Sequence, residues 1–279
     1  MAWRIGIDIG GTFTDVALIE ESGGRIGIAK VLTTPRDFGE AVLRGIRQGL
    51  DRHGIDPATV SLLSHATTVV TNALLENKGA RTGFVATRGF RDLLELRRSS
   101  RSDLYDLFQD APAVLVPRRF RYEIGGRIDA QGEVVTPLAE DEVDGIADAI
   151  RAAGLETVAV SLMFSFLNDT HERRLGAMLR ELLPGVAVFL SSEVLPEIRE
   201  FERASTTAVC AKVGPLLEGY LDRLARATRS LGLPELHVMG SSGGVVAGKN
   251  RSPPSITITG CPSPRIVAIV EAACGTPPL

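Results

Sequence analysis

The N-terminal part of the chain alternates between extended and helical patterns. Apolar and β-branched positions predict strands at residues 3–9, 13–20 and 25–33, with glycine-containing turns between them. After Asp37, apolar residues recur every three or four positions, which predicts a helix that begins with Asp37 as its N-cap. Its inward positions are Phe38, Val42, Leu43, Ile46 and Leu50.

The same alternation continues to residue 87. We expect a strand at residues 60–64, a helix at 68–78 that ends at Gly79, and a strand at 82–87. The predicted order is therefore β-β-β-α-β-α-β, in a chain of the α/β class.

Residues 89–137 show a weaker pattern and are rich in arginine. A run that starts just before it consists of Arg88, Arg91, Arg97, Arg98, Arg101, Arg118, Arg119 and Arg121, interleaved with Asp92, Glu95, Asp103 and Asp106. This composition has two interpretations, a surface of salt bridges or an insertion that binds an anion.

A second α/β segment follows. The expected strands are at 157–163, 186–190 and 236–239, and a helix is expected at 140–153. A second helix is expected to begin with a capping box formed by Asp169 and Glu172. A long helical stretch is expected at 197–231, with a break at Gly214-Pro215. From residue 249 the pattern changes, because proline is dense there, and we expect a poorly folded tail at 249–279.

Composition adds only exclusions. The formal charge of -3 and the pI of about 5.9 argue against a nucleic-acid-binding protein. No apolar run approaches the ~20 residues of a membrane span, and Asp8 comes too early for a signal peptide. Cys210, Cys261 and Cys274 are widely spaced, which indicates reduced thiols, so we expect a cytoplasmic protein without a membrane partner.

The strongest chemical signal is the turn between the first two strands, where the sequence reads Asp-Ile-Gly-Gly-Thr-Phe-Thr-Asp from Asp8 to Asp15. Gly10 and Gly11 allow close approach of the backbone to an anion, and the N–H groups of such a turn bind phosphate oxygens. Thr12 and Thr14 are two residues apart, so we expect their hydroxyls to share one face and to add donors. Asp8 is placed to hold a hydrated Mg²⁺.

A second polar junction lies between the predicted strand at 60–64 and the helix at 68–78. His65 stands there, followed by Thr67 and Thr68. A histidine in this position is suited to acid–base chemistry, to hydrogen bonding or to a capping role, and the helix N-terminus is suited to an anion.

Other nucleotide and catalytic motifs fail on context. A second strand, not a helix, follows the Gly-Gly turn, which excludes a dinucleotide-binding fingerprint. Residues 243–250 approach a phosphate-binding loop of the Walker type, but Asn250 stands where Ser or Thr is required and prolines follow. No Gly-x-Ser-x-Gly motif occurs.

Several segments, taken together, resemble one family. The segments are residues 8–15, 64–75, 78–82, 89–92, 101–107, 164–168, 191–202, 203–207 and 241–244. They resemble the hydantoinase A / 5-oxoprolinase family over residues 3–248. That family is similar to the actin, sugar-kinase and heat-shock ATPase superfamily, so the resemblance implies an actin-like (ribonuclease H-like) ATPase lobe followed by a second α/β segment.

The resemblance implies ATP-dependent opening of a cyclic amide of the 5-oxoproline or hydantoin type, in which phosphorylation makes the amide oxygen a leaving group. ATP and Mg²⁺ are the implied cofactors, and a hydantoinase B-like subunit is an implied partner. Asp8 would bind Mg²⁺ and act in catalysis, and His65 and Asn72 would be catalytic. The phosphate residues would be Gly10, Gly11, Thr12, Phe13 and Thr14, and Thr67 and Thr68 would lie near the substrate.

The chain departs from the family pattern in two respects. Gly240 stands where the family has Gln, and no second Asp-x-Gly-Gly-Thr hairpin occurs. We therefore expect a truncated chain, in which a shifted reading frame encodes residues 249–279 and they no longer follow the family sequence. Two alternatives stay open, a subunit of an ATP-dependent ketone carboxylase and a non-catalytic fragment. The expected domains are 1–118, 119–190 and 191–248, followed by the tail.

Overall fold

Alternating burial along the first three strands forms the N-terminal sheet. Strands β1 (Trp3–Ile9), β2 (Phe13–Glu20) and β3 (Ile26–Leu32) form two consecutive antiparallel hairpins. Every second side chain is buried against helix α1 (Phe38–His53), and the residues between them point to the other face. One face of this part of the sheet is therefore packed and the other is open.

The computed structural model describes residues 2–34, 38–99, 105–106, 108, 113–239 and 245–247. By its internal contacts the chain divides into two units. Among the described residues, the first unit contains those up to residue 77 and those from 216 to 247, and the second contains those between 78 and 215. The predicted N-cap Asp37 and the predicted tail at 249–279 lie outside the described residues.

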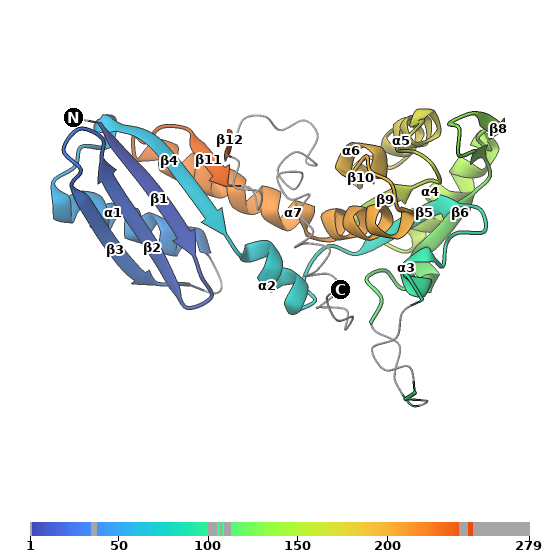
Figure 1. Cartoon of the computed structure of the whole chain (residues 1–279), viewed down its shortest axis with the longest axis horizontal. Coiled ribbons are helices and arrows are strands. Elements are labelled where there is room, and N and C mark those ends of the chain that lie inside the picture. The colour runs from blue at the N-terminus through green and yellow to red at the C-terminus, as the bar shows by residue number, and fades with distance from the viewer. Residues whose placement is uncertain are drawn as a thin grey trace. The chain divides into compact units, whose positions relative to one another are not determined.

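The first unit is built on a six-stranded sheet in the order β12-β11-β4-β1-β2-β3 (Figure 1). Strand β4 (Val60–Thr67) runs parallel to β1, and β11 (Leu236–Met239) runs parallel to β4. Strand β12 (Val245–Ala247) pairs antiparallel with β11. Helix α2 (Val69–Leu75) follows β4 after a single residue, so the end of β4 leads directly into a helix.

Helix α1 packs closely on the sheet because two of its own residues that face the sheet are glycines. A methyl group added at Gly49 would stand 2.9 Å from Leu18 Cδ1, and one at Gly45 would stand 2.9 Å from Val16 Cγ2. Both glycines are therefore required for the observed distance between helix and sheet.

The second unit contains a four-stranded sheet in the order β10-β9-β5-β6, in which all neighbouring strands are parallel. Helices α4 and α5 cover it with a core that includes Val85, Val158 and Val160. The elements are β5 (Thr82–Thr87), α3 (Leu93–Leu96), β6 (Arg121–Ile124), β7 (Arg127–Ile128), β8 (Val134–Thr136), α4 (Val143–Ala152), β9 (Thr157–Ser161), α5 (Thr170–Leu182), β10 (Ala187–Leu190) and α6 (Ser191–Val194).

Helix α7 (Glu200–Ser230) corrects one prediction. The sequence predicted a break at Gly214-Pro215, but the helix continues through Pro215. A proline removes one N–H donor and crowds the preceding turn. Here the flanking turns are anchored by buried side chains, including Val213 and Leu217, so packing holds the helix together on both sides of the proline.

The capping box predicted at the start of α5 is also wrong. Asp169 precedes the helix but makes no capping hydrogen bond with its side chain. The carbonyl oxygen of the Asn168 side chain accepts from the Thr170 N–H at 3.1 Å instead. Glu172 is fully buried and accepts the Leu162 N–H at 2.7 Å, so a tertiary contact has replaced the local one.

The α/β class and the chain order β-β-β-α-β-α-β are confirmed. Strand β5 belongs to the second sheet and β11 lies beside β4 in the first, so the first unit is built from two separate stretches of the chain. Period and turn chemistry predict the elements, but they contain no signal for which sheet a strand joins.

Within the described residues, no helix combines the length and the apolar character that crossing a membrane requires.

The two faces of the N-terminal sheet predict a contrast in stability. Leu18→Ala deletes a fully buried side chain against Gly49 and should lower the free energy of unfolding by about 2–5 kcal/mol. Ile28→Ala, on the open face at 62% exposure, should change it by less than about 0.5 kcal/mol. Urea denaturation of both variants measures this, and equal losses would contradict the assignment of the faces.

Candidate functional site

The β1–β2 turn and the end of β4 lie at one edge of the first unit's sheet. Because β1 and β4 are parallel, their carboxyl ends meet, and Ile9 is the register partner of Thr67. Ligands of open α/β sheets bind outside the carboxyl ends of such strands. The predicted phosphate turn and Thr67 are therefore brought together, as the family resemblance implies.

The carbonyl groups of this turn are held by two threonines. The Thr68 hydroxyl donates to the Ile9 carbonyl at 2.9 Å, and the Thr33 hydroxyl donates to the Gly10 carbonyl at 3.0 Å. The Thr33 N–H donates to the Thr12 carbonyl at 2.9 Å. Three of the turn's acceptors are thus already satisfied by the protein.

The donors of the turn have a different environment. Gly10 uses its N–H within the turn, donating to the Phe13 carbonyl at 2.9 Å. Gly11 and Thr12 are exposed, and among the described residues their N–H groups meet no protein acceptor. A Cβ added at Gly11 would meet nothing within 4 Å. A turn with its carbonyls held and its N–H groups open is suited to an anion.

Asp8 stands at the open face of the sheet, beside this turn. Its side chain is exposed and hydrogen-bonds to none of the described residues. No group of three metal-ligating side chains occurs in the described ranges. A single exposed carboxylate beside the turn fits Mg²⁺, because this ion commonly keeps several waters and takes only one or two carboxylates together with substrate phosphates.

Thr14 does not share an open face with Thr12. Its side chain is fully buried, and its hydroxyl lies 3.0 Å from the Thr33 hydroxyl. Phe13 is the exposed neighbour, at 42%. The side-chain period of the strand begins at Phe13, so Thr14 points inward and supports the turn. Thr33 was missed by the sequence analysis, because only the β2–β3 register brings it to the turn.

His65 lies on the other face of the sheet from Asp8. It shares the buried face with its register partner Ile7 and is 0% exposed, whereas Asp8 pairs with Ala66. Its Nε2 lies 2.9 Å from the Tyr220 hydroxyl. Burial lowers the pKa of His65 to about 4, so the ring is neutral at physiological pH. The structure therefore does not bring His65 together with Asp8.

Thr67 is the last residue of β4, and Asn72 lies on helix α2. The Thr67 hydroxyl accepts the Val69 N–H at 3.1 Å, which makes Thr67 a support of the helix start. Asn72 is half-buried on α2, and its N–H donates to the Thr68 carbonyl at 2.9 Å. Residues 241–244, which completed the family pattern, and Cys261 and Cys274 lie outside the described residues.

Five of the described arginines of the arginine-rich stretch form ion pairs, namely Arg88, Arg91, Arg98, Arg118 and Arg121. Arg118 binds Asp92 at 3.0 and 3.1 Å, and buried Arg121 reaches Glu95 at 2.9 Å. Arg98 pairs with Glu202. These contacts favour the salt-bridged interpretation for these side chains over an anion-binding insertion, while Arg101 lies outside the described part.

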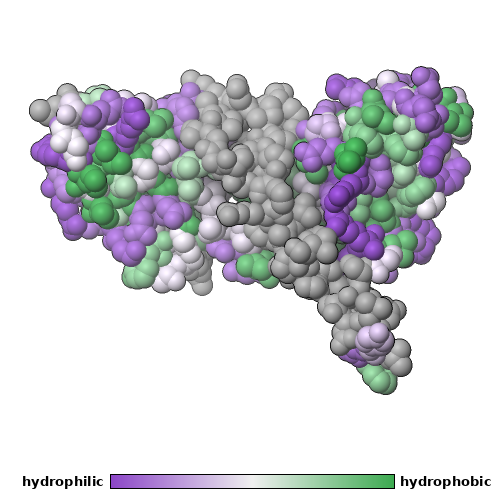
Figure 2. Space-filling view, viewed as in Figure 1, coloured by the Kyte–Doolittle hydropathy of each residue, from purple (hydrophilic) through white to green (hydrophobic). Residues whose placement is uncertain are grey.

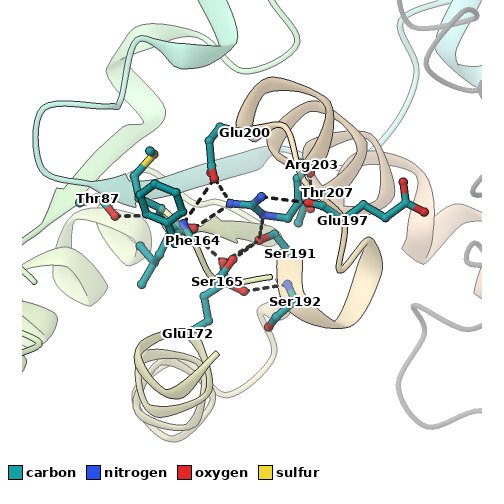
Figure 3. Close-up of polar contacts among 12 residues, drawn as sticks. Thr87, Phe164, Ser165, Glu172, Ser191, Ser192, Glu197, Glu200, Arg203 and Thr207 are labelled. Atoms are coloured by element: carbon teal, nitrogen blue, oxygen red, sulfur yellow. Dashed lines mark hydrogen bonds and ion pairs between the residues drawn. The ribbon is translucent and has the colours of Figure 1, made fainter. Parts of the chain in front are cut away.

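A second polar cluster in the second unit surrounds Arg203 (Figure 3). This fully buried guanidinium donates to the Leu162 carbonyl at 3.0 Å, to the Glu197 carbonyl at 3.1 Å and to the Ser191 hydroxyl at 3.1 Å, and it also pairs with Glu200. Neither its burial nor its partners were apparent from the sequence.

The same cluster fixes the loop after β9 through three successive N–H groups. The Leu162 N–H donates to the Glu172 carboxylate at 2.7 Å, and the Met163 N–H donates to the Thr87 hydroxyl oxygen at 3.0 Å. The Phe164 N–H donates to the Glu200 carboxylate at 3.3 Å. Phe164 itself has a positive φ of 59°. Burial raises the pKa of Glu172. All three donors are occupied by the protein itself, so we assign this cluster a structural role.

Comparison with known proteins identifies the family. Residues 4–183 match the hydantoinase/oxoprolinase N-terminal region. The fold is that of a mixed α/β protein, and the chain belongs to the hydantoinase/oxoprolinase N-terminal region family.

Three relatives show its range. The caprolactamase alpha subunit of Pseudomonas jessenii is 37% identical over 253 residues, covering 88% of this chain and 36% of that subunit, and the solved caprolactamase superposes with a TM-score of 0.79. A nucleotide-free structure of acetone carboxylase gives a TM-score of 0.82 at 25% identity, covering 92% of this chain and 38% of that one. The 5-oxoprolinase of Saccharomyces cerevisiae is 29% identical over 289 residues, covering 88% of this chain and 22% of the enzyme.

The chain thus spans between 22% and 38% of these relatives' own lengths. Activities of the complete proteins therefore apply to this chain only as proposals.

The neutral state of His65 predicts acid sensitivity. Its folded pKa of about 4 lies below the ordinary 6.5, so the unfolded chain binds the proton first. The stability due to neutral His65 is complete above pH 6.5 and is lost as pH falls from 6.5 toward 4, by on the order of 3 kcal/mol. His65→Gln should show a smaller loss between pH 7 and 4.5 in urea denaturation. The exposed His53→Gln variant is the control, and an acid response equal to the wild type's in His65→Gln would refute the assignment.

The Arg203 cluster predicts a large cost for its central side chain. Arg203→Met leaves buried carbonyls and Glu200 without a cation and should lower the free energy of unfolding by about 3–5 kcal/mol. Arg173→Met is the matched control, because Arg173 is 65% exposed and pairs with Asp169 on the surface. Its unfolding midpoint should hardly move. Similar midpoints for the two variants would show that the cluster is not needed for stability.

Proposed function

We propose that this chain binds the phosphates of Mg²⁺-ATP at the β1–β2 turn. One observation carries the proposal, namely that the carbonyls of Ile9, Gly10 and Thr12 are bound by the protein while the N–H groups of Gly11 and Thr12 stay open at a strand end. Phosphate oxygens accept hydrogen bonds and would complete this arrangement.

In this proposal each residue of the site has a defined part. Gly11 and Thr12 donate to phosphate, and Asp8 accepts hydrogen bonds from, or ligates, the hydrated Mg²⁺. Thr14 supports the turn from its buried side, while Phe13 covers it from the open side. Thr67, Thr68 and Asn72 shape the neighbouring helix start, where a substrate would approach.

The names of two relatives support ATP as the nucleotide. The caprolactamase structure is that of an ATP-dependent enzyme, and the acetone carboxylase structure concerns ATP-dependent carboxylation. The acetone carboxylase structure covers 92% of this chain with a TM-score of 0.82, and the caprolactamase structure covers 87% with a TM-score of 0.79.

For the reaction we propose the opening of a cyclic amide, of the lactam, hydantoin or 5-oxoproline type. ATP supplies a phosphoryl group that activates the amide oxygen as a leaving group. The contribution of this chain is to fix the phosphates and to stabilise the charge that develops on them. The 37% identity to the caprolactamase alpha subunit favours this substrate class.

Ketone carboxylation is the second candidate. The acetone carboxylase structure superposes with a TM-score of 0.82 over 92% of this chain, slightly better than the caprolactamase structure. The turn serves either reaction, because both relatives use ATP by name. We also propose that the chain works with a second subunit, since the caprolactamase relative is itself an alpha subunit.

Removal of Asp8 is the direct test. Asp8→Ala should weaken Mg²⁺-ATP binding at least about 10-fold, because the metal loses a charged ligand or water partner. Isothermal titration calorimetry with and without Mg²⁺ measures this, and omission of Mg²⁺ should weaken the wild type in the same way. Asp51→Ala, which removes an exposed carboxylate from α1, should bind as the wild type does.

Two results would decide against the proposal. If the wild-type chain binds no nucleotide, the chain is a non-catalytic fragment, and if Asp8→Ala binds like Asp51→Ala, the site lies elsewhere. ATP hydrolysis in the presence of a candidate partner subunit separates the substrate classes. Stimulation by caprolactam, hydantoin or 5-oxoproline favours amide opening, and stimulation by acetone with bicarbonate favours carboxylation.

A further inference from the structure

Three charged residues form a row across the open face of the first unit's sheet. Asp8 on β1 is the register partner of Asp15 on β2, and Asp15 is the register partner of Lys30 on β3. Cross-strand partners on one face have Cβ atoms ~5 Å apart, so the row extends about 10 Å from Asp8. Of the rows of register partners that have a charged side chain on each of the three strands, this one lies nearest to the turn.

The ammonium of Lys30 is directed toward the turn. Its Nζ lies 2.8 and 3.0 Å from the two carboxylate oxygens of Asp15. It also lies 4.8 Å from the ring centroid of Phe13, which precedes Asp15 by one step on the same face. Because Phe13 is the first residue of β2 after the turn, this contact places the positive charge at the turn end of the strand.

The face around this row is open and mostly apolar. Its other members on β2 and β3 include Ile19, Ile26, Ile28 and Leu32, which are 46–67% exposed. Figure 2 shows such apolar residues beside charged ones on the first unit. Lys30 and Asp15 are themselves about half exposed, at 53% and 47%. A ligand at the turn therefore reaches Lys30 without any rearrangement of the core.

An anionic ligand beside this row requires cations, because the row holds two carboxylates and only one ammonium. Two carboxylates, Asp8 and Asp15, face the place where phosphate would bind, and like charges at such distances repel. The Mg²⁺ of the proposed site offsets one of them. Lys30 is the cation of this row that lies beside the other carboxylate, that of Asp15. Lysine binds phosphate as a compact point charge on a flexible stem, which suits exchange between two anions.

We propose that Lys30 is a phosphate-binding residue of this site and that Asp15 is a positioning residue that holds its ammonium beside the turn. When nucleotide binds, Nζ passes from the Asp15 carboxylate to a phosphate oxygen. This inference rests on the proposed binding of Mg²⁺-ATP at the β1–β2 turn and adds a specific cation to it.

A surface ion pair on the same face offers a matched control. Arg4, also on β1, pairs with Glu21 at 2.6 Å and is 59% exposed, close to the 53% of Lys30. It stands four residues before Asp8, near the opposite end of the strand. Arg4→Ala and Lys30→Ala each remove one positive charge from this face, so a general effect of net charge would appear in both.

The experiment is calorimetric titration of the wild type, Lys30→Ala, Lys30→Arg, Asp15→Asn, Arg4→Ala and Asp8→Ala with Mg²⁺-ATP. Lys30→Ala should weaken binding about 10- to 100-fold, as loss of a charge-assisted hydrogen bond does, and Lys30→Arg should recover part of that loss. Arg4→Ala should bind within about 2-fold of the wild type. Thermal melting of each variant confirms that it is folded.

Asp15 is tested by a double-mutant cycle. Asp15→Asn should weaken binding in the wild-type background, because the ammonium is no longer held at the turn. In the Lys30→Ala background the same change should produce no further weakening, which a merely structural role of Asp15 would not predict.

The outcomes separate this inference from the function on which it rests. If the wild type binds Mg²⁺-ATP, Asp8→Ala does not, and Lys30→Ala binds like Arg4→Ala, then the nucleotide site stands and Lys30 has no part in it. If the wild type binds no Mg²⁺-ATP, both are overturned. Selective weakening in Lys30→Ala, with rescue by arginine, establishes the assignment.

Discussion

The arrangement at the β1–β2 turn depends on hydrogen bonds that bind its carbonyl groups. A tight turn presents both acceptors and donors, and an anion approaches only if the acceptors point elsewhere. Thr33, the residue after β3, binds the carbonyls of Gly10 and Thr12, and Thr68, the residue after β4, binds the carbonyl of Ile9. The direction of the turn's carbonyl groups is therefore set by two residues outside it, one after β3 and one after β4.

The local features of this site could be predicted from the sequence. Alternating polarity gave the strands, Gly10 and Gly11 gave the turn, and the position of Asp8 at a strand end gave an exposed carboxylate. The errors came from the direction of side chains and from long-range partners. Thr14 is buried because it lies on the inward side of β2 with Val16, and His65 is neutral because its side of β4 is buried, which lowers its pKa.

Long-range pairing explains the other differences. Glu172 had the spacing of a capping residue, yet a buried loop with unsatisfied N–H groups gains more from its carboxylate than the helix start does. Residues 82–87 were correctly predicted as a strand, but only tertiary contacts place them in the second sheet. Pro215 breaks an isolated helix, but buried neighbours on both sides carry this one through it. In each case a local rule was overruled by a partner far along the chain.

The parallel pairing of β11 with β4 has a consequence for biosynthesis. About 170 residues separate the two strands, so at ribosomal rates roughly 8–35 s pass between the emergence of one and of the other. During that interval the β4 edge has unpaired backbone groups, and His65 lacks the hydroxyl of Tyr220. Nascent chains of this protein therefore pass through a stage at which the second unit is fully synthesised while the first still has an open edge, the stage at which a chaperone that binds exposed strands would act.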